Sequence, residues 1–334
     1  MRVTGYRGHE QDILALRNAN RESAQFTEYL DWRYLGPAQR TGSEVLWLDT
    51  AQGMAAGMAA LIQRAYWIDG APAQIGVLGD ISLNEMFRGK GLGKLLLSAM
   101  TVHCEQSHAG RTGFVIPTEA ARRSLAAAGW STGGLLIPHV MLLNPAVKMQ
   151  PHCGSLARPL AAGYRLAIRT WLGWTRRRVD RLDYPVDFAA DFDAFWQAFP
   201  KQGLCLADRS AATLKWRYTC HPHQRFRIAS LNDGDRLVGY LVFECGEDSC
   251  FIYDVLARSV HALQRMIAPF VLQMMQEGLC SIRIMLNDAH PYRRVFTRMG
   301  FFARPDSAVF QLLRPPVAMR GALTWMLTQG DKDI

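Results

Sequence analysis

The chain has 334 residues, of which 49% are hydrophobic, enough for two domains with a core in each. It contains no apolar run of the roughly 18–20 residues that a membrane span needs, no recognisable signal peptide, and seven scattered cysteines without a Cys-x-x-Cys pair, so we expect a cytoplasmic protein with reduced thiols. The formal net charge of +9 arises in residues 120–179, which hold nine Lys or Arg and no Asp or Glu. Such a basic segment indicates an anionic partner: a cofactor, an acidic carrier protein, a membrane surface or, least expected, nucleic acid.

The predicted elements begin with a segment that recurs later in the chain. Leu-Asp-Trp-Arg-Tyr-Leu-Gly-Pro at 30–37 is matched by Leu-Lys-Trp-Arg-Tyr-Thr-Cys-His-Pro at 214–222. Each copy precedes three strand-like segments: 44–49, 53–64 and 74–83 in the first, and 225–231, 237–244 and 249–256 in the second. A helix, a strand and a second helix follow in both. Two segments with the same order of strands and helices predict an internal duplication, with the two copies docked together.

The aromatic side chains of this repeated segment have two interpretations. Trp32 and Tyr34 in the first copy, like Trp216 and Tyr218 in the second, are suited to line an acceptor cleft on which a sugar stacks. They are equally suited to fill equivalent places in two cores. Since both copies carry them and only one carries the turn described next, packing is favoured.

A glycine-rich turn separates a predicted strand from a predicted helix. The apolar run at 75–83 leads into Arg88-Gly89-Lys90-Gly91-Leu92-Gly93, and apolar residues at 95–97 follow. A helix that begins after such a turn presents unpaired N–H groups and the positive end of its dipole, and glycine lets a phosphate approach the backbone. The turn therefore predicts a pyrophosphate site.

Two familiar phosphate-binding turns do not fit this spacing. A Walker turn needs a hydroxyl residue after Gly-Lys, and none follows at Lys90 or Lys94. A dinucleotide-binding turn has Gly-x-Gly-x-x-Gly, whereas the spacing here is Gly-x-Gly-x-Gly. A glycine turn without a ligand is the remaining alternative. In the second copy the corresponding residues, 257–262, contain no glycine, so we expect only the first copy to bind a cofactor.

A basic connector joins the two copies. Apolar residues recur at spacings of three and four and predict an amphipathic helix: Leu156, Leu160, Tyr164, Ala167, Trp171 and Trp174. We expect this stripe to pack across the interface between the copies, and the alternative is a helix at a membrane surface. Three consecutive arginines at 176–178 are expected to be solvated or to meet a phosphate or an acidic carrier.

The turn at 88–93 resembles the coenzyme A pyrophosphate loop of the GNAT acyltransferase superfamily, Arg/Gln-x-x-Gly-x-Gly/Ala. Over about residues 20–310 the chain resembles tandem GNAT proteins encoded with polysaccharide-biosynthesis systems, and more distantly the Fem-type aminoacyl transferases. The matching motifs are Gly79-Asp80 before the loop, 115–118 at the end of a later strand, 128–130 and 214–222. The family's Asn after Pro117 is Thr118 here.

The resemblance implies an α/β (α+β) fold of two GNAT-like domains, each a mixed, mostly antiparallel twisted sheet flanked by helices. The boundaries we predict are 1–145 for the domain with the coenzyme A loop, 146–183 for the basic connector, 184–316 for a degenerate second domain and 317–334 for a C-terminal helix or tail. The co-substrate implied is acetyl-CoA or another acyl-CoA, without a metal. The residues expected to bind it are Ile81, Leu83, Arg88, Gly89, Lys90, Gly91, Leu92, Gly93 and Thr118.

The reaction implied is transfer of the acyl group to an amine, which must lose a proton before it attacks. Asp80 is the candidate base, because a carboxylate in an apolar strand is costly unless it is paired or functional; a structural, hydrogen-bonded Asp is the alternative. Glu85 and Glu119 are further candidates. The tyrosine that many GNAT enzymes use as general acid is replaced by Leu125 in the first copy and Phe296 in the second. Another group or water then protonates the thiolate, or catalysis has been lost.

We therefore expect an acyl-CoA-dependent N-acyltransferase acting on a small or carbohydrate-linked amine. One alternative is acyl transfer from an acyl-carrier protein or an aminoacyl-tRNA that docks on the basic connector. Another is an acyl-CoA-binding scaffold without activity. The location expected is cytoplasmic, with attachment to the membrane periphery as an option.

Overall fold

The computed structural model describes residues 1–21, 24–36, 42–107, 112–175, 180–315 and 323–331. In its first half the elements are, in chain order, β1 (Arg2–Gly5), α1 (Glu10–Asn18), α2 (Thr27–Leu35), β2 (Ser43–Asp49), β3 (Ala55–Ile68), β4 (Ala71–Leu83), η1 (Glu85–Phe87), α3 (Leu92–Ser107), β5 (Thr112–Val115), α4 (Glu119–Ala127) and β6 (Ser131–Leu142). The connector forms α5 (Ala146–Cys153), η2 (Gly154–Leu156) and α6 (Ala157–Thr175).

The second half repeats the order of the first. Its elements are α7 (Ala190–Ala198), β7 (Leu204–Ala207), α8 (Ala211–Leu214), the π-helical turn η3 (Lys215–Thr219), β8 (Arg227–Asp233), β9 (Arg236–Cys245), β10 (Ser249–Ala257), α9 (Val260–Gln276), β11 (Ser281–Asn287), α10 (Arg293–Arg298), β12 (Phe302–Ala303), β13 (Ala308–Leu313), β14 (Thr324–Trp325) and η5 (Gln329–Asp331). In both halves three antiparallel strands are followed by a helix, a strand parallel to the third, and a helix. The predicted order of elements is therefore confirmed.

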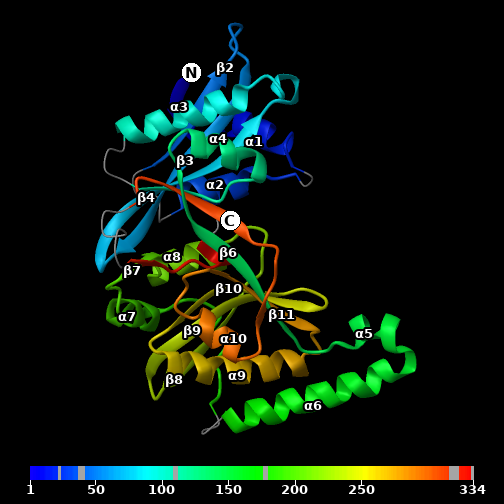
Figure 1. Cartoon of the computed structure of the whole chain (residues 1–334). Coiled ribbons are helices and arrows are strands. Elements are labelled where there is room, and N and C mark those ends of the chain that lie inside the picture. The colour runs from blue at the N-terminus through cyan, green and yellow to red at the C-terminus, as the bar shows by residue number, and fades with distance from the viewer. Residues whose placement is uncertain (22–23, 37–41, 108–111, 176–179, 316–322, 332–334) are drawn as a thin grey trace.

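The strands of the described residues form one continuous mixed sheet (Figure 1). Its order is β1-β2-β3-β4-β5-β13-β6-β11-β10-β9-β8, with β7, β12 and β14 paired beside this path. Most neighbours are antiparallel, and β4–β5, β10–β11 and β7–β14 are parallel. The predicted α/β class, with a mixed, mostly antiparallel sheet flanked by helices, is confirmed.

The two halves exchange strands at the middle of this sheet. β13, which comes from the second half of the chain, lies between β5 and β6 of the first half. β6 in turn pairs with β11 along seven residues, from Leu136 to Leu142. The sheet thus continues across the boundary predicted at residue 145. The second half contributes β13 as a neighbour of β5 and β6, and the first half contributes β6 as a neighbour of β11.

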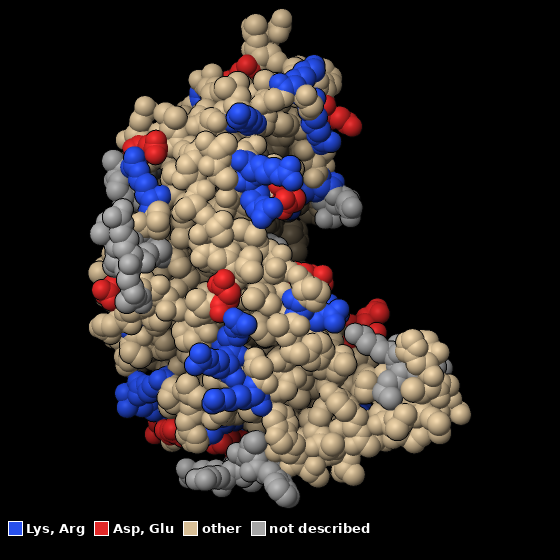
Figure 2. All heavy atoms as spheres, in the orientation of Figure 1, with Lys and Arg blue, Asp and Glu red and all other residues tan. Residues whose placement is uncertain are grey.

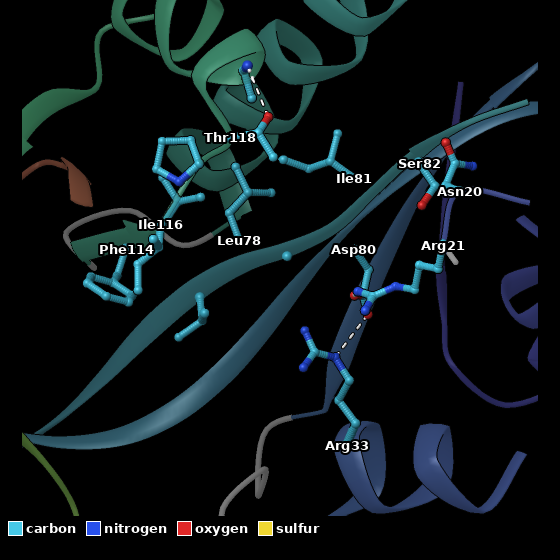
Figure 3. A pocket seen from close by; sticks show the side chains of 15 residues that line it. Asn20, Arg21, Arg33, Leu78, Asp80, Ile81, Ser82, Phe114, Ile116 and Thr118 are labelled. Atoms are coloured by element: carbon cyan, nitrogen blue, oxygen red, sulfur yellow. Dashed lines mark hydrogen bonds and ion pairs between the residues drawn. The ribbon is translucent and has the colours of Figure 1, made fainter. Parts of the chain in front are cut away.

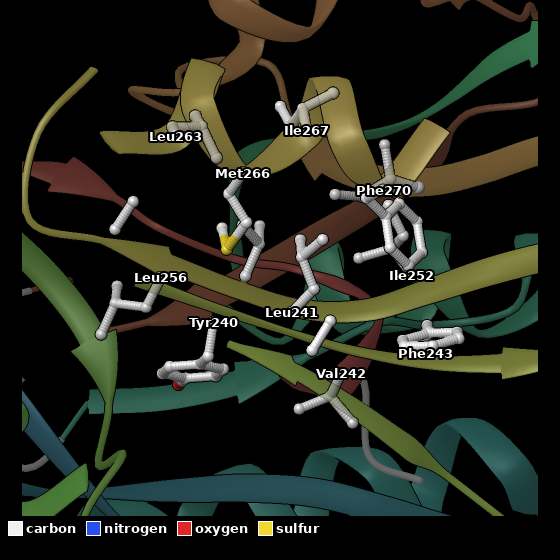
Figure 4. Packing of buried hydrophobic residues seen from close by; sticks show 14 of the residues in the cluster. Tyr240, Leu241, Val242, Phe243, Ile252, Leu256, Leu263, Met266, Ile267 and Phe270 are labelled. Atoms are coloured by element: carbon white, nitrogen blue, oxygen red, sulfur yellow. The ribbon is translucent and has the colours of Figure 1, made fainter. Parts of the chain in front are cut away.

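The first half carries helices on both faces of its strands. Alternate side chains of a strand point to opposite faces, so Val45 and Trp47 pack with α1 and α2, while Leu46 and Leu48 pack with α3 and α4. In the second half, α9 covers β9 and β10 through Leu263, Ile267 and Phe270 (Figure 4). These cores fix the strands that border the site described below.

The connector helix is confirmed, but only part of its predicted packing face contacts the rest of the protein. α6 lies against the second half through Ile168 and Leu172, and Ala157 and Ala161 nearer its start are buried as well. Leu156 and Leu160 of the predicted stripe point away and are 64% and 50% exposed. Tyr164 and Trp171 are 39% exposed each, but the Tyr164 hydroxyl donates to the carbonyl of Leu142 at 3.1 Å, and the Trp171 ring lies 3.6 Å from the place of a Cβ atom on Gly300. The helix carries two apolar faces, so periodicity alone did not decide which one packs. The side chain of Trp174 and the arginines at 176–178 lie outside the described residues.

The predicted C-terminal helix is also wrong for the part of 317–334 that the structure describes. Thr324 and Trp325 form β14, which pairs with β7, and Trp325 is buried among the aromatic rings of Tyr66, Phe114 and Phe310. The extended backbone places this ring in the core.

Among the described residues, no helix combines the length and the apolar character needed to cross a membrane.

Candidate active site

The glycine-rich turn has the backbone geometry that the sequence predicted. Gly89 and Gly91 have φ angles of 75° and 76°, a region that residues with a side chain rarely adopt. A Cβ atom built on either glycine would have no neighbour within 4 Å, so this part of the backbone borders open space. α3 begins immediately afterwards at Leu92 and has no acidic residue in its first turn. The first N–H groups of such a helix lack intrahelical acceptors and attract anions.

The third glycine brings the helix close to the strand. A Cβ atom on Gly93 would lie 3.3 Å from Cδ1 of Leu83, the last residue of β4, so glycine lets the start of α3 approach the end of β4. Leu83 also packs over Gly57 of β3, where a Cβ atom would lie 2.5 Å from its Cδ2. The side chain of Leu83 therefore packs closely against Gly57 of β3 and Gly93 of α3, where any larger residue would collide with it.

Arg88 fastens the turn to α1. Its Nη2 donates to Oδ1 of Asn20 at 2.9 Å and to the carbonyl of Ala19 at 3.3 Å. Nδ2 of Asn20 donates in turn to the carbonyl of Leu83 at 3.0 Å. Lys90 is exposed, with Nζ 5.5 Å from the centre of the Phe87 ring. Arg88 is thus an anchor of the turn, whereas Lys90 is the charged side chain that extends from it.

A cleft lies beside the turn, where β4 and β5 diverge. The two strands pair only from Ile75 to Val77 of β4, and a bulge follows at Asp80, whose φ is 52°. The cleft has a volume of about 350 Å³ (Figure 3). Its walls include Leu78, Ile81 and Ser82 of β4, Phe114 and Ile116 at the end of β5, and Thr118. The Thr118 hydroxyl accepts a hydrogen bond from the backbone N–H of Ala121 and caps α4.

Asp80 lies at one side of this cleft and is held by α1 and α2. Its Oδ2 accepts hydrogen bonds from Nε of Arg33 at 3.0 Å and from the Tyr34 hydroxyl at 2.7 Å. Its Oδ1 forms an ion pair with Arg17, and Nη2 of Arg21 lies 3.8 Å away. Only 1% of the Asp80 side chain is exposed. Burial raises the pKa of Tyr34, so its hydroxyl stays protonated and donates.

The other two candidate carboxylates do not face the cleft wall that Asp80 occupies. Glu85 is exposed in η1, and Glu119 is exposed in the first turn of α4, where it pairs with Nη2 of Arg122 at 2.7 Å. Leu125 and Phe296, at the positions of the missing tyrosines, are fully buried core residues. The structure therefore brings Ile81, Thr118 and Asp80 together at the cleft and leaves Glu85 and Glu119 outside it.

The second half repeats the carboxylate but not the turn. Asp254 comes directly after a bulge in β10, whereas Asp80 lies within the bulge of β4, and Asp254 is fully buried in an ion pair with Arg209 at 3.1 Å. α9 begins differently from α3, because the Ser259 side chain accepts a hydrogen bond from the N–H of Ala262. The backbone N–H of Ala262, which could otherwise bind an anion, is therefore already hydrogen-bonded. Both halves thus contain a buried carboxylate on the third strand, whereas only the first half contains the glycine turn.

Sequence reasoning missed the guanidinium groups around Asp80. Arg17 lies on α1 and Arg33 on α2, far from β4 in the chain. The signal was present in the repeated Trp-Arg-Tyr segment, where a charged residue stands between two buried aromatic residues. The interpretation of its aromatic residues as core is confirmed, because Trp32, Tyr34, Trp216 and Tyr218 are all at most 9% exposed.

Comparison with known proteins gives a match over this region and over the whole fold. Residues 11–130 match the family model described as the acetyltransferase (GNAT) family. No curated protein sequence matches the chain. A GCN5-related N-acetyltransferase from Anabaena variabilis ATCC 29413 has a similar structure, with a TM-score of 0.66 and 12% identity, over 93% of this chain and 72% of that one.

Two further solved structures share the fold. A probable N-acyltransferase from Enterococcus faecalis V583 has a TM-score of 0.65 and 9% identity, over 93% of this chain and 71% of that one. N-myristoyltransferase from Saccharomyces cerevisiae, solved with bound myristoyl-CoA, has a TM-score of 0.57 and 10% identity, over 93% and 82%. At these identities the likeness establishes the fold. The similarity to the acetyltransferase (GNAT) family model is confined to residues 11–130, in the first half of this fold.

Proposed function

We propose that the protein transfers an acyl group from acyl-CoA to an amine, with the cofactor held by the first half. The observation that carries the proposal is the link between the glycine turn and the cleft: Asn20 lines the cleft and accepts a hydrogen bond from Arg88 of the turn, and β4, which leads to the turn, forms one wall of the cleft. The pyrophosphate would meet the backbone of 88–93 and the first turn of α3. The pantetheine arm would then enter the cleft along β4, past Ile81 and Thr118, with Lys90 available to a phosphate.

The chemistry that we propose needs one bond to form and one to break. The amine nitrogen attacks the thioester carbon, the C–S bond breaks, and the sulfur leaves as a thiolate. A backbone N–H at the diverging end of β4 polarises the carbonyl oxygen. Since both oxygens of Asp80 already receive bonds from cations or a hydroxyl, we propose that Asp80 positions α1 and α2 and that the amine loses its proton to water. Ser82 and Thr118 are the hydroxyl residues of the cleft wall.

The experiment is a calorimetric titration of acyl-CoA thioesters with chains of two to fourteen carbons, followed by thiol release in the presence of amines. One binding site per chain and thiol release that depends on the amine support the proposal. Binding without release from a broad amine panel indicates the scaffold alternative. If no thioester binds and an acyl-carrier protein or aminoacyl-tRNA does, the donor is carried by that partner.

We also propose that α6 attaches the protein to an anionic membrane surface. Leu156 and Leu160 are exposed around the start of α6, which forms with α5 an arm that projects from the body (Figure 1), and Figure 2 shows almost no charge on the face of the arm turned to the viewer. Arg158, Arg165 and Arg169 lie on another side of the same helix. Apolar residues that enter the headgroup region and arginines that meet anionic lipid are the components of an interfacial helix.

Vesicle sedimentation tests this attachment. We expect binding to vesicles of phosphatidylcholine with phosphatidylglycerol, weaker binding to phosphatidylcholine alone, and loss of binding in the double variant Leu156→Ser, Leu160→Ser. Val186→Ser is the matched control, because Val186 is 93% exposed and lies outside the arm. Absence of wild-type binding to anionic vesicles refutes attachment, and salt-sensitive binding to an acyl-carrier protein instead assigns the arm to a carrier.

A further inference from the structure

Two cysteines face each other across the hairpin that joins β9 and β10. Cys245 is the last residue of β9, and its register partner is Cys250, the second residue of β10. The backbone N–H of Gly246 donates to the carbonyl of Ser249 at 2.9 Å, which makes these two residues a hydrogen-bonded pair. Pairs alternate along an antiparallel ladder, so Cys245 and Cys250 form a non-hydrogen-bonded pair, the kind in which side chains lie closest together.

A pair of this kind has the separation that a disulfide needs. The Cα atoms of a non-hydrogen-bonded pair lie about 4.5 Å apart, and disulfides span Cα separations of about 4.4–6.8 Å. Both side chains lie on the face of the sheet that α9 covers, because Cys250 belongs to the core there and Cys245 packs against it. Sγ of Cys245 lies 3.9 Å from Sδ of Met274, a buried residue of α9. The backbone of the hairpin therefore already has the spacing that a bond between the two sulfur atoms requires.

The two thiols have different surroundings. Cys250 is fully buried, whereas Cys245 is partly exposed at the end of its strand. Nη1 of Arg227 lies 3.7 Å from Sγ of Cys245, and the same guanidinium binds Glu277 at 2.8 and 3.0 Å. A hydrogen bond from Cys250, and then the charge of Arg227, lower the pKa of Cys245 against the opposing effects of burial and Glu277. The interaction with Cys245, together with burial, raises the pKa of Cys250. Cys245 is thus the thiol that ionises first and that a reagent reaches from solvent.

The fold itself does not require a cysteine pair at this place. In the equivalent hairpin of the first half, between β3 and β4, Ile68 and Ala71 form the last pair. An aliphatic pair therefore suffices to close such a hairpin. An ionisable, partly exposed thiol with a second thiol directly opposite is instead the arrangement of redox-sensitive cysteines, in which one sulfur is oxidised and the other then reacts with it.

We propose that Cys245 and Cys250 form an oxidative modification site, at which a peroxide converts the two thiols into a disulfide. The Cys245 thiolate attacks one oxygen of the peroxide, the O–O bond breaks, and the other oxygen leaves with the proton that Cys245 has lost, so that Cys245 becomes a sulfenic acid. The Cys250 sulfur then attacks the Cys245 sulfur, the S–O bond breaks, and hydroxide leaves with the Cys250 proton as water. The two sulfur atoms lose two electrons in total, and the peroxide gains them. The site lies in the second half, so it is independent of the acyl-CoA site proposed in the first.

Peptide mapping of the full-length protein after peroxide treatment tests the assignment. Both cysteines lie on one tryptic peptide, residues 237–258, so an internal disulfide lowers the mass of this peptide by two hydrogen atoms and leaves no thiol for an alkylating reagent. With equimolar hydrogen peroxide we expect this change to be roughly tenfold faster than oxidation of the exposed Cys220, and to be reversed by dithiothreitol. Two alkylated thiols on this peptide after Cys220 has been oxidised, or irreversible addition of oxygen to Cys245, overturn the proposal.

Three variants assign the roles of the two sulfur atoms. Cys250→Ala keeps the core apolar and should stop the reaction at the sulfenic acid of Cys245, which dimedone captures. Cys245→Ser should leave the buried Cys250 as a thiol. Cys280→Ser is the control, because Cys280 lies beside the same hairpin, with Sγ 4.0 Å from Oδ1 of Asp248, and this variant should form the disulfide as the wild type does. A wild-type disulfide that joins Cys280 to either cysteine of the pair would overturn the assignment.

Discussion

Trp32 and Trp216 stack on each other and exchange hydrogen bonds. Their ring centres are 5.1 Å apart with 19° between the ring planes. Nε1 of Trp32 donates to the carbonyl of Trp216 at 2.6 Å, and Nε1 of Trp216 donates to the carbonyl of Trp32 at 2.8 Å. The two residues occupy the same position in the repeated segment, so the halves meet through a reciprocal contact. Each indole N–H is bonded to the backbone of the other residue, and each ring packs on the other.

This reciprocity predicts strong coupling between the two residues. Trp32→Phe and Trp216→Phe should each destabilise the protein, because either change leaves a buried carbonyl unpaired. Because each single variant already weakens the same ring stacking, the double variant should lose less than the sum, with a coupling energy of roughly 1–3 kcal/mol in a double-mutant cycle. Urea denaturation of the four proteins measures it. Additive losses would show that the halves do not depend on this contact.

Gly91→Glu should abolish acyl-CoA binding. The substitution places a carboxylate against the pyrophosphate and forces a side chain into a positive φ, at a cost of about 1–2 kcal/mol. Gly53→Glu is the matched control, because Gly53 also has a positive φ of 81° and open space around its Cβ, in the turn between β2 and β3. The control should lose similar stability and retain full affinity in calorimetry. Retained affinity in Gly91→Glu would refute the assignment of the turn.

Asp80→Asn should act mainly on stability. Removing the charge leaves Arg17 and Arg33 buried around a neutral group, which typically costs about 3–5 kcal/mol. Asp254→Asn makes the equivalent change beside Arg209 in the half without the glycine turn. If Asp80 only positions α1 and α2, turnover per folded molecule and its pH profile should change little. Loss of the acidic limb of the pH–rate profile in Asp80→Asn alone would return Asp80 to the role of general base.

His221 should make the fold less stable in mild acid. Its Nδ1 accepts hydrogen bonds from the backbone N–H groups of His223 at 3.2 Å and Gln224 at 2.9 Å, and its ring packs on Trp32. Burial, with a smaller effect of His223, lowers the pKa of His221 to about 4. In the unfolded chain His221 binds a proton near pH 6.5, whereas in the folded chain it does so only near pH 4. The contribution of His221 to the free energy of unfolding is therefore complete above pH 6.5 and falls as the pH decreases toward 4.

The His221→Asn variant isolates this effect, because an amide oxygen can still accept from the two N–H groups without binding a proton. Its free energy of unfolding, measured in urea at pH 7 and pH 5, should fall less than that of the wild type between the two values. Equal losses in the two proteins would assign the acid sensitivity to other groups, such as the buried His290.

The features that the sequence predicted correctly are those encoded by neighbouring residues. The order of elements along the chain, the glycine turn and the α6 helix follow from local patterns of side chains, and positive φ at Gly89 and Gly91 is a property of glycine itself. The surroundings of Asp80 were missed because Arg17 and Arg33 reach it from separate helices. The exposed face of α6 was misjudged because Ala157 and Ile168 form a second apolar stripe that is equally periodic. Contacts between residues far apart in the chain, such as those around Asp80, and the face of a helix that packs depend on tertiary structure, which local patterns do not encode.

The exchanged strand has a consequence for the order in which the protein is made. Residues 11–130 leave the ribosome first, but β5 gains its second neighbour only when residues 308–313 have emerged and formed β13. Until then one wall of the cleft is a sheet edge. A product of interrupted translation therefore carries every residue of the glycine turn without a finished cleft, and only a chain synthesised nearly to its end can assemble the complete site.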